Sequence, residues 1–559
     1  MKINRKNLPL LLFGALSLLL ILLYFAWIRP AQEAASSTTS PPPVTLPGED
    51  VHYGNRVLIP YIARENMLAV TIHNKNGEFR FARTKDGVLT PKEKFIMEVR
   101  EGEKYLSYPH VSYNQESFSS LVVGAGTVYV QDRVVDATDD PARLHEYGLS
   151  DADDPAWYEI VCLETQADGT TAEKTVRIIV GDATVAGNSY YLRREGSNDV
   201  YVSAVARTGE VAHSVIADYV DPVLCEPHAE HGHYYSRAFS VFKKDELFLS
   251  IDFLNMSRRD DFHAGVAYAI VAPDSMRPYM PNSNNYMGVL ETVGTLKGSK
   301  TVAVGLSANK ERYGLSAYRI YYETPLSAGS DEVYDRDVNV NVYTPNTLFI
   351  SQKQEDGTYF VGSTESDIVA KVDGDALNFL DRPLSWWLAP ELFTVSVDKT
   401  AALRFSFTYP DVNRQYSLRF TRVADTPKKY VTDGVYYVYQ ENGQTMERQL
   451  LLEAYQNLHL NLATIRYAGL YDDDDNRPPK SELMAEANCK LSLTLEMTDG
   501  SVYEYRFYPY TERHVLVSIS ERGGPAGAWF YITADEPEKI YRDLELILAG
   551  KIPNPDKRY

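Results

Sequence analysis

The chain has 559 residues, enough for about three domains, and its composition restricts the classes of protein to which it can belong. The formal net charge is −20, and binding to nucleic-acid phosphates requires a basic face, so no nucleic-acid partner is expected. An apolar content of 44%, with 41 tyrosines and 20 phenylalanines, is typical of well-packed globular structure. Three scattered cysteines do not make a disulfide framework, and Cys162 and Cys489 lie in strand-like patterns that favour burial.

The first feature along the chain is an uninterrupted apolar run, Leu8–Ile28. As a helix it would span roughly 30 Å, about the thickness of the hydrocarbon core of a bilayer. Three basic residues precede the run within residues 1–7, and only Arg29 follows it directly. The positive-inside rule therefore predicts a single-pass protein of the cell membrane, with residues 1–7 in the cytoplasm and the C-terminal body outside.

A cleaved signal peptide is the alternative to this anchor. Its apolar region is usually about 7–15 residues long, shorter than Leu8–Ile28, and the nearest small-residue site, Ala34–Ser36, lies well beyond the run. We therefore predict an uncleaved anchor. Residues 29–50 follow, rich in Pro, Ser and Thr, and this composition predicts an extended linker that holds the body away from the membrane.

The remaining chain is predicted to hold three modules, 51–224, 225–390 and 391–559. Their marker is Tyr-Gly-Leu at 147–149, which recurs at 313–315 and, more loosely, as Tyr-Ala-Gly-Leu at 467–470. Each module is predicted to contain opening strand pairs, a helix, the marker, further antiparallel strands and a closing helix. The sequence therefore predicts an α+β fold of repeated antiparallel sheets.

Period-two and helical spacings locate these elements. In the first module we expect strands at Leu68–His73, Glu78–Arg83, Thr175–Val180, Ser189–Leu192 and Val200–Ser203, and helical segments at Glu116–Leu121 and Val211–Tyr219. In the second we expect strands at Phe239–Phe242, Leu247–Phe253, Thr347–Ser351 and Thr358–Val361, and helical segments at Asn285–Leu296 and Ser366–Phe379. In the third we expect strands at Thr394–Val397, Leu403–Tyr409, Lys490–Glu496, Val502–Phe507, His514–Ile519 and Trp529–Ile532, and helices at Met446–Leu462 and Glu536–Leu548.

Three segments of the first module carry a family resemblance: Leu144–Leu149 (LHEYGL), Ile178–Arg194 (IIVGDATVAGNSYYLRR) and Asp199–Ala204 (DVYVSA). Together with the anchor they resemble domain-of-unknown-function family 4340, a bacterial exocytoplasmic domain. The match is best over residues 65–222, and the other two modules resemble the family only in their general arrangement of elements. The resemblance implies a membrane-anchored accessory envelope protein, of a kind often encoded beside ABC-transporter components, and it carries over no catalytic residue.

The densest group of metal-ligating residue types is the cluster His228, His231 and His233. Imidazoles at this spacing can bind zinc or another transition metal, but the pattern matches no defined zinc motif and falls at a module boundary. A polar linker is therefore the preferred interpretation, and no metal or other cofactor is predicted. The acidic run Asp472–Asp475 likewise lacks the glycine and glutamate positions of an EF-hand calcium loop.

No pattern in the chain predicts catalysis. Ser189 and Ser363 lie near glycines but outside Gly-x-Ser-x-Gly, and neither phosphate-binding glycine pattern occurs. Several strand aromatics could stack on sugars, although packing in the core is the simpler expectation: Tyr190, Tyr191, Tyr201, Tyr359, Phe360, Trp529, Phe530 and Tyr531. Asn282–Tyr286 (NSNNY) is expected to be a polar turn.

Three functions follow from these observations, in decreasing order of support. The first is a non-enzymatic extracytoplasmic scaffold or sensor that works with an ABC-type transporter or an envelope complex. The second is a cell-envelope polysaccharide-binding protein with aromatic platforms. The third is a metal-dependent hydrolase that uses the three clustered histidines.

Overall fold

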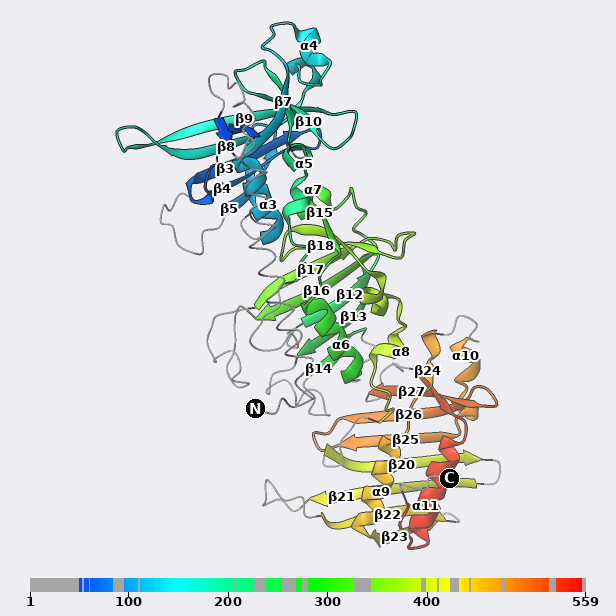
Figure 1. Cartoon of the computed structure of the whole chain (residues 1–559). Coiled ribbons are helices and arrows are strands. Elements are labelled where there is room, and N and C mark those ends of the chain that lie inside the picture. The colour runs from blue at the N-terminus through cyan, green and yellow to red at the C-terminus, as the bar shows by residue number, and fades with distance from the viewer. Residues whose placement is uncertain are drawn as a thin grey trace, which may run out of the picture. The chain divides into compact units, whose positions relative to one another are not determined.

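A computed structural model of the chain (Figure 1) describes residues 50–52, 55–59, 61–83, 95–108, 111–204, 207–225, 238–253, 268–273, 280–325, 343–393, 399–409, 412–422, 432–441, 444–473, 479–521 and 529–554. The chain divides into two compact units, Met1–Pro109 with Asn114–Tyr219, and His110–Tyr113 with Val220–Tyr559. The expected anchor Leu8–Ile28 and nearly all of the linker lie outside the described residues. Within them, no helix combines the length and the apolar character that crossing a bilayer requires.

The first unit is built on an eleven-stranded antiparallel sheet with the order β1-β2-β7-β11-β10-β9-β8-β3-β4-β5-β6. Its strands are β1 (Asp50–His52), β2 (Asn55–Ile59), β3 (Met67–Asn74), β4 (Gly77–Arg83), β5 (Phe95–Glu101), β6 (Lys104–Tyr108), β7 (Val128–Val135), β8 (Ala156–Thr165), β9 (Thr171–Ala183), β10 (Tyr190–Arg194) and β11 (Val200–Ser203). Its helices are α3 (Gln115–Gly126), α4 (Pro141–His145) and α5 (Arg207–His213), with short turns η3 (Arg64–Asn66), η4 (Asp151–Asp153) and η5 (Ile216–Tyr219). Helices α3 and α5 contact each other and one face of the sheet.

The second unit contains two further sheets. The eight-stranded sheet has the order β14-β13-β12-β16-β17-β18-β19-β15. Its elements are β12 (Ala238–Lys243), β13 (Glu246–Phe253), β14 (Tyr268–Ala272), α6 (Ser283–Gly294), β15 (Lys300–Val304), α7 (Leu306–Asn309), β16 (Tyr318–Pro325), β17 (Tyr343–Ile350), β18 (Tyr359–Ser363), β19 (Ile368–Val372), η9 (Gly374–Asp381) and α8 (Leu384–Trp387).

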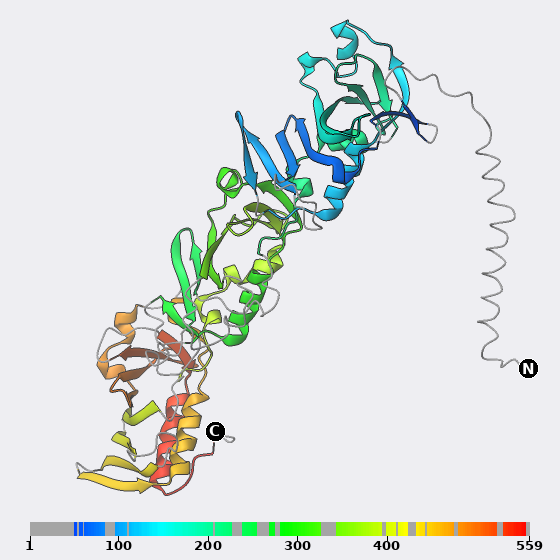
Figure 2. The ribbon, with the colours of Figure 1, turned by 90° about the vertical axis from the view of Figure 1, so that its left-hand side faces the viewer.

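The nine-stranded sheet has the order β23-β22-β21-β20-β25-β26-β27-β28-β24. Its elements are β20 (Thr400–Tyr409), β21 (Val412–Arg422), β22 (Thr432–Glu441), β23 (Gln444–Leu450), α9 (Leu452–Ala463), β24 (Gly469–Leu470), η11 (Tyr471–Asp473), α10 (Lys480–Leu483), η12 (Glu486–Asn488), β25 (Leu491–Met497), β26 (Val502–Pro509), β27 (His514–Glu521), β28 (Trp529–Thr533) and α11 (Glu536–Leu548). Figures 1 and 2 show α9 and α11 lying along one face of this sheet. The expected antiparallel α+β structure is confirmed.

The three sheets share one strand order. Read from β7, the first runs β7-β11-β10-β9-β8-β3-β4-β5-β6; read from β15, the second runs β15-β19-β18-β17-β16-β12-β13-β14; read from β24, the third runs β24-β28-β27-β26-β25-β20-β21-β22-β23. Each strand from β7 to β5 therefore has a counterpart at the same position in the other two sheets. Among the described strands, β6 and β23 correspond to each other but have no equivalent in the second sheet, and β1 and β2 have none in the second or the third.

The helix that precedes the first of these strands is also the same in each sheet. Helices α3, α6 and α9 each have twelve residues. At the fourth position of each stands a fully buried aromatic side chain, Phe118, Tyr286 or Tyr455. A threonine follows each helix directly, at 127, 295 and 464. The aromatic rings pack toward the sheet; Tyr286, for example, lies 5.8 Å from the ring of Phe239 in β12.

Two short segments, 220–225 and 388–393, make matching hydrogen bonds in the second unit, and we call them the joint segments. Asp221 N donates to Ser112 O at 3.1 Å, and Ala389 N donates to Met280 O at 2.9 Å. Three residues later, Leu224 N donates to Leu296 O and Leu392 N donates to Ile465 O. Both leucines are fully buried, so each joint segment combines backbone pairing on two sides with an apolar anchor.

The marker at Tyr147–Leu149 and the marker at Tyr313–Leu315 form the same turn. Gly148 and Gly314 have φ values of 65° and 60°, a conformation that glycine adopts without steric cost. The leucine N–H then donates to the carbonyl five residues earlier, and the leucine side chain is buried. The third marker does not form this turn, because Gly469 and Leu470 make up β24 and pair with β28. In the strand order of its sheet, β24 holds the position that β7 and β15 hold in the other two sheets.

Three other expectations are wrong. The helix expected at Met446–Leu462 begins only at Leu452, because Met446–Leu450 pairs with β22 as part of β23. Ser366–Phe379 is not one helix, because Asp367 has a positive φ of 53° and the sequence Ile368–Val372 pairs with β15 and β18 as β19. Only its end is helical, as part of the 3-10 helix η9. The segment Asn282–Tyr286 is not a turn, because Asn282 caps α6 by accepting a hydrogen bond from Asn285 N. The strand expected at Thr394–Val397 lies outside the described residues.

Replacing the joint leucine, Leu392→Ala, should lower the stability of the second unit by about 2–5 kcal/mol, because a buried side chain is lost and a cavity is left. The urea midpoint of the full chain, followed by tryptophan fluorescence, measures this loss. The control Leu460→Ala removes a leucine of α9 that is 49% exposed and should leave the midpoint nearly unchanged. Equal effects of the two changes would contradict the anchoring role of Leu392.

Candidate functional site

The face of the first sheet that the core does not use carries two rows of polar side chains. On the core face β3 and β4 place Val70, Ile72, Phe79 and Phe81, and the alternate residues point the other way. The first row contains Tyr105, Arg100, Glu78, His73 and Trp157, from β6 to β8. The second contains Ser107, Glu98, Arg80, Thr71, Glu159 and Arg177, from β6 to β9. We call these the Glu78 row and the Glu98 row.

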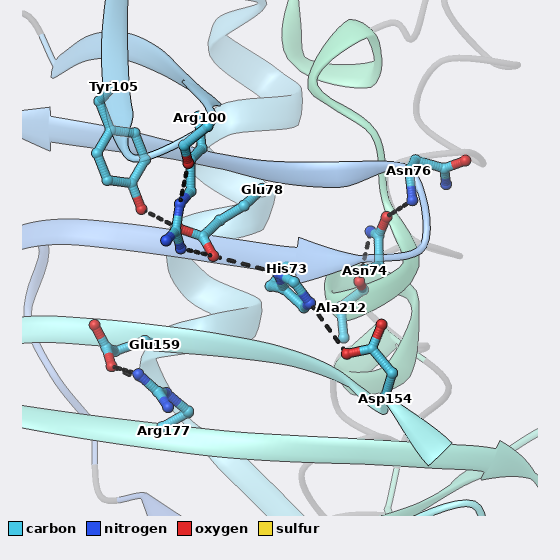
Figure 3. Close-up of polar contacts among 11 residues, drawn as sticks. His73, Asn74, Asn76, Glu78, Arg100, Tyr105, Asp154, Glu159, Arg177 and Ala212 are labelled. Atoms are coloured by element: carbon cyan, nitrogen blue, oxygen red, sulfur yellow. Dashed lines mark hydrogen bonds and ion pairs between the residues drawn. The ribbon is translucent and has the colours of Figure 1, made fainter. Parts of the chain in front are cut away.

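Glu78 is the centre of the first row, and its side chain is only 6% exposed (Figure 3). Arg100 Nη1 donates to both carboxylate oxygens, at 3.1 and 3.0 Å, and the Tyr105 hydroxyl donates to Oε1. His73 Nδ1 lies 3.2 Å from Oε2. Every approach to this carboxylate from neighbouring strands is therefore occupied by a hydrogen-bonding partner.

The surroundings of Glu78 keep it ionised. Burial alone would raise its pKa, but the hydrogen bonds from Tyr105 and Arg100 and the charge of Arg100 outweigh burial, so the pKa lies below its usual value. Burial and the adjacent carboxylate raise the pKa of Tyr105 to about 12. At neutral pH the tyrosine therefore stays a hydrogen-bond donor and Glu78 stays its acceptor.

Cation–ring contacts join the Glu98 row to the Glu78 row. The Arg80 guanidinium lies 3.9 Å from the ring centre of Tyr105, and that of Arg177 lies 4.2 Å from the ring centre of Trp157. The imidazole of His73 stacks on Trp157 at 5.1 Å with an interplanar angle of 9°. Arg177 is itself held by Glu159, with Nη2 donating to Oε2 at 2.6 Å. These contacts occupy the indole of Trp157 and leave it poorly placed to stack on a sugar.

An acidic loop after the first marker brings three aspartates into contact with three different basic side chains. Asp151 accepts from Arg193 Nη2 at 2.5 Å, and Asp153 lies 2.6 Å from His145 Nδ1. Asp154 lies 3.6 Å from His73 Nε2, which joins the loop to the Glu78 row (Figure 3). Through these contacts the loop and the row form one continuous polar network.

The same loop fixes the marker turn on the sheet. Arg193 Nε donates to Leu149 O at 3.0 Å, and the Leu149 side chain is packed in an apolar cluster with Leu144, Ile179 and Val200. Gly181 of β9 permits this approach, because a Cβ atom there would lie 2.1 Å from Tyr147 O. The marker is therefore a packing element of the first sheet rather than a chemical site.

Most of the metal candidates from the sequence lie where the structure gives no description. His228, His231 and His233 lie outside the described residues. Within the described ranges, no group of three His, Cys, Asp or Glu side chains is arranged to hold a metal ion. Of the acidic run, Asp472 lies 3.6 Å from Lys480 Nζ and Asp473 belongs to η11, whereas residues 474 and 475 lie outside the described residues.

The candidate nucleophiles are enclosed. Ser189 and Ser363 are buried in the sheets, and Cys162 and Cys225 are buried free thiols. Burial raises the pKa of both thiols, so they are protonated at neutral pH. Cys225 Sγ lies 3.0 Å from the Tyr322 hydroxyl, which donates to Glu365 at 2.8 Å, so this thiol is part of a buried hydrogen-bond chain.

Most of the strand aromatics serve the core. Tyr201, Tyr359, Trp529 and Phe530 are at most 3% exposed, so they are not available to a ligand. Tyr190, Tyr191, Phe360 and Tyr531 are half-buried. Tyr191 packs on the marker ring of Tyr147 at 4.7 Å, and Phe360 packs on Tyr313 at 5.0 Å. The aromatic content therefore reports packing around the markers more than a binding platform.

The chain matches no model of a protein family, and it matches no curated protein.

Replacing Glu78→Gln should lower the stability of the first unit by about 1–3 kcal/mol at neutral pH, because Arg100 and Tyr105 lose a charged acceptor. The pKa of Glu78 is depressed by folding, so its contribution is fully present above the ordinary pKa of 4.5. That contribution is lost as the pH falls through the lower folded-state value. Urea unfolding as a function of pH should therefore show a shallower acid limb in the variant.

The control for Glu78→Gln is Glu164→Gln, in which the lost partner is the exposed Lys174. An exposed pair of this kind contributes about 0–1 kcal/mol, so its acid limb should match that of the unmodified chain. Identical pH profiles for the two variants would contradict the central role of Glu78.

Replacing Arg193→Lys should loosen the acidic loop, because lysine cannot donate to Leu149 O and Asp151 in the same geometry. Hydrogen exchange across residues 144–154 should become faster, by an amount equal to about 1–3 kcal/mol of local stability. The neighbouring change Arg194→Lys is the control and should leave exchange in this loop unaltered. Unchanged protection in Arg193→Lys would show that the marker packing alone holds the loop.

Proposed function

We propose that this chain is a membrane-anchored extracytoplasmic scaffold without enzymatic activity, built from three related α+β modules. The observation that carries the proposal is the common strand order of the three sheets, together with the matching twelve-residue helices. Repetition of one core with different outer faces is typical of chains that present several binding surfaces. Catalysis instead requires reactive groups that converge in one cleft.

The charged groups of the first sheet support a binding role over a reactive one. Glu78, Glu98 and Glu159 each have a positively charged partner on a neighbouring strand. Such satisfied pairs rigidify a surface and fix its pattern of charge. A rigid, patterned face is suited to the recognition of another macromolecule.

The proposed partner is a subunit of an ABC-type transporter or envelope complex in the same membrane. The apolar run Leu8–Ile28 and the polar linker 29–50 support this choice, because a tether raises the local concentration of the modules near a membrane partner. The segments Leu144–Leu149 and Ile178–Arg194 support a relationship of the first module to domain-of-unknown-function family 4340. Membership of the first module in that family would imply the role of an accessory envelope protein.

Crosslinking of the full chain in its native membrane, followed by mass spectrometry, should recover transporter subunits. The matched control replaces Leu8–Ile28 by a cleaved signal peptide; without the tether, recovery should fall by at least about tenfold. If repeated experiments recover no membrane protein, the scaffold proposal is wrong. Recovery of wall polymer alone would favour the polysaccharide-binding alternative.

A further inference from the structure

The first unit contains a surface depression of about 540 Å³ that belongs neither to the polar rows nor to the joint segments. One side is formed by the first turns of α3, with Glu116, Ser117 and Ser120. The other side is formed by α5 and η5, with Glu210, His213 and Asp218 among others. A volume of this size is within the range of small-molecule sites.

The wall of the depression is built by close packing. Tyr190 of β10 lies directly on α5, where Gly209 has no side chain; a Cβ atom there would lie 1.9 Å from Tyr190 Cδ2. His213 packs on the same tyrosine at 5.3 Å. Asn74 holds the end of α5 by donating from Nδ2 to Ala212 O at 2.9 Å and Ser214 O at 2.7 Å, as Figure 3 shows in part. The aromatic wall is therefore fixed on a rigid support.

Among the residues that the structure describes, the lining carries three carboxylates and neither lysine nor arginine. Asp218 accepts from Val215 N at 3.0 Å, but Glu116 and Glu210 have no hydrogen-bond or ion-pair partner among the described residues. Burial and the charge of the nearby Lys75 lower the pKa of His213, so its ring is neutral at physiological pH and does not offset these charges. The depression thus combines three carboxylates with the ring of Tyr190.

We propose that this depression binds a small organic cation that carries ammonium groups. Carboxylates and serine hydroxyls accept hydrogen bonds from an ammonium group, and the ring of Tyr190 attracts a cation that approaches it. Two unpaired carboxylates on separate helices favour a ligand with two positive charges over one with a single charge. The binding site is independent of the proposed scaffold role, since either can fail alone.

Calorimetric titration of the full chain in mild detergent tests this site with 1,4-diaminobutane as the probe and 1,4-butanediol as its neutral counterpart. The diamine should bind, added salt should weaken it, and the diol should not bind. The double change Glu116→Gln with Glu210→Gln should reduce the affinity at least about tenfold. Nα-acetyl-lysine methylamide distinguishes a lysine side chain of a partner from a free diamine, according to which of the two binds more tightly.

Two further variants keep the test decisive. Gly209→Ala displaces the Tyr190 wall without altering charge and should also weaken the diamine at least about tenfold, while circular dichroism checks that the fold persists. Glu103→Gln changes an exposed carboxylate on the β5–β6 turn, outside the depression, and should leave affinity unchanged. Equal binding of diol and diamine, or unchanged affinity in the double variant, overturns the proposal.

Discussion

The structure depends on one packing constraint, the burial of a single aromatic side chain between a twelve-residue helix and the face of an antiparallel sheet. Phe118, Tyr286 and Tyr455 meet this constraint at the same helical position. An aromatic ring buries more apolar surface than any other side chain, and close-packed interiors tolerate little change in its volume. The length of the helix and the place of the strands beneath it are therefore conserved between the three sheets, although few other residues are shared.

The faces that this packing does not use are free to differ. On the first sheet they carry the Glu78 and Glu98 rows, in which oppositely charged side chains pair across neighbouring strands. At matching places on the second sheet, Arg319 lies over the ring of Phe242 at 3.9 Å, and Lys310 lies over Phe349 at 3.5 Å. The core thus supplies stability, whereas the outer faces differ from sheet to sheet.

The sequence predicted the antiparallel α+β class and many of the strands, because their alternation is local and strong. It identified the first two markers as a repeat, and in the structure both form the same turn, with glycine at a positive φ. It misassigned the third, because Tyr-Ala-Gly-Leu resembles the turn in letters but pairs as a strand with β28. The better signal was the match of Thr295-Leu296-Lys297 with Thr464-Ile465-Arg466, which follows equal helices.

The polar rows and the depression could not be predicted in the same way. Glu78 and Arg100 are 22 residues apart, and Asn74 and Ala212 are 138 residues apart, so only the strand order brings them together. The joint segments were within reach of sequence reasoning. Residues 219–225 (YVDPVLC) and 387–393 (WLAPELF) share an aromatic, a proline and a leucine at equal spacing, a short repeat that the longer marker overshadowed.

A chain that contains three sheets of one topology faces a hazard during folding, because a strand from one sheet can enter the equivalent place in another. The charge rows of the first sheet oppose this exchange. If β12 took the place of β3, its outward residues Ser240 and Phe242 would face the carboxylate and guanidinium groups of β4 and β8 without a partner for them. The differences between the outer faces therefore also favour the pairing of each strand within its own sheet.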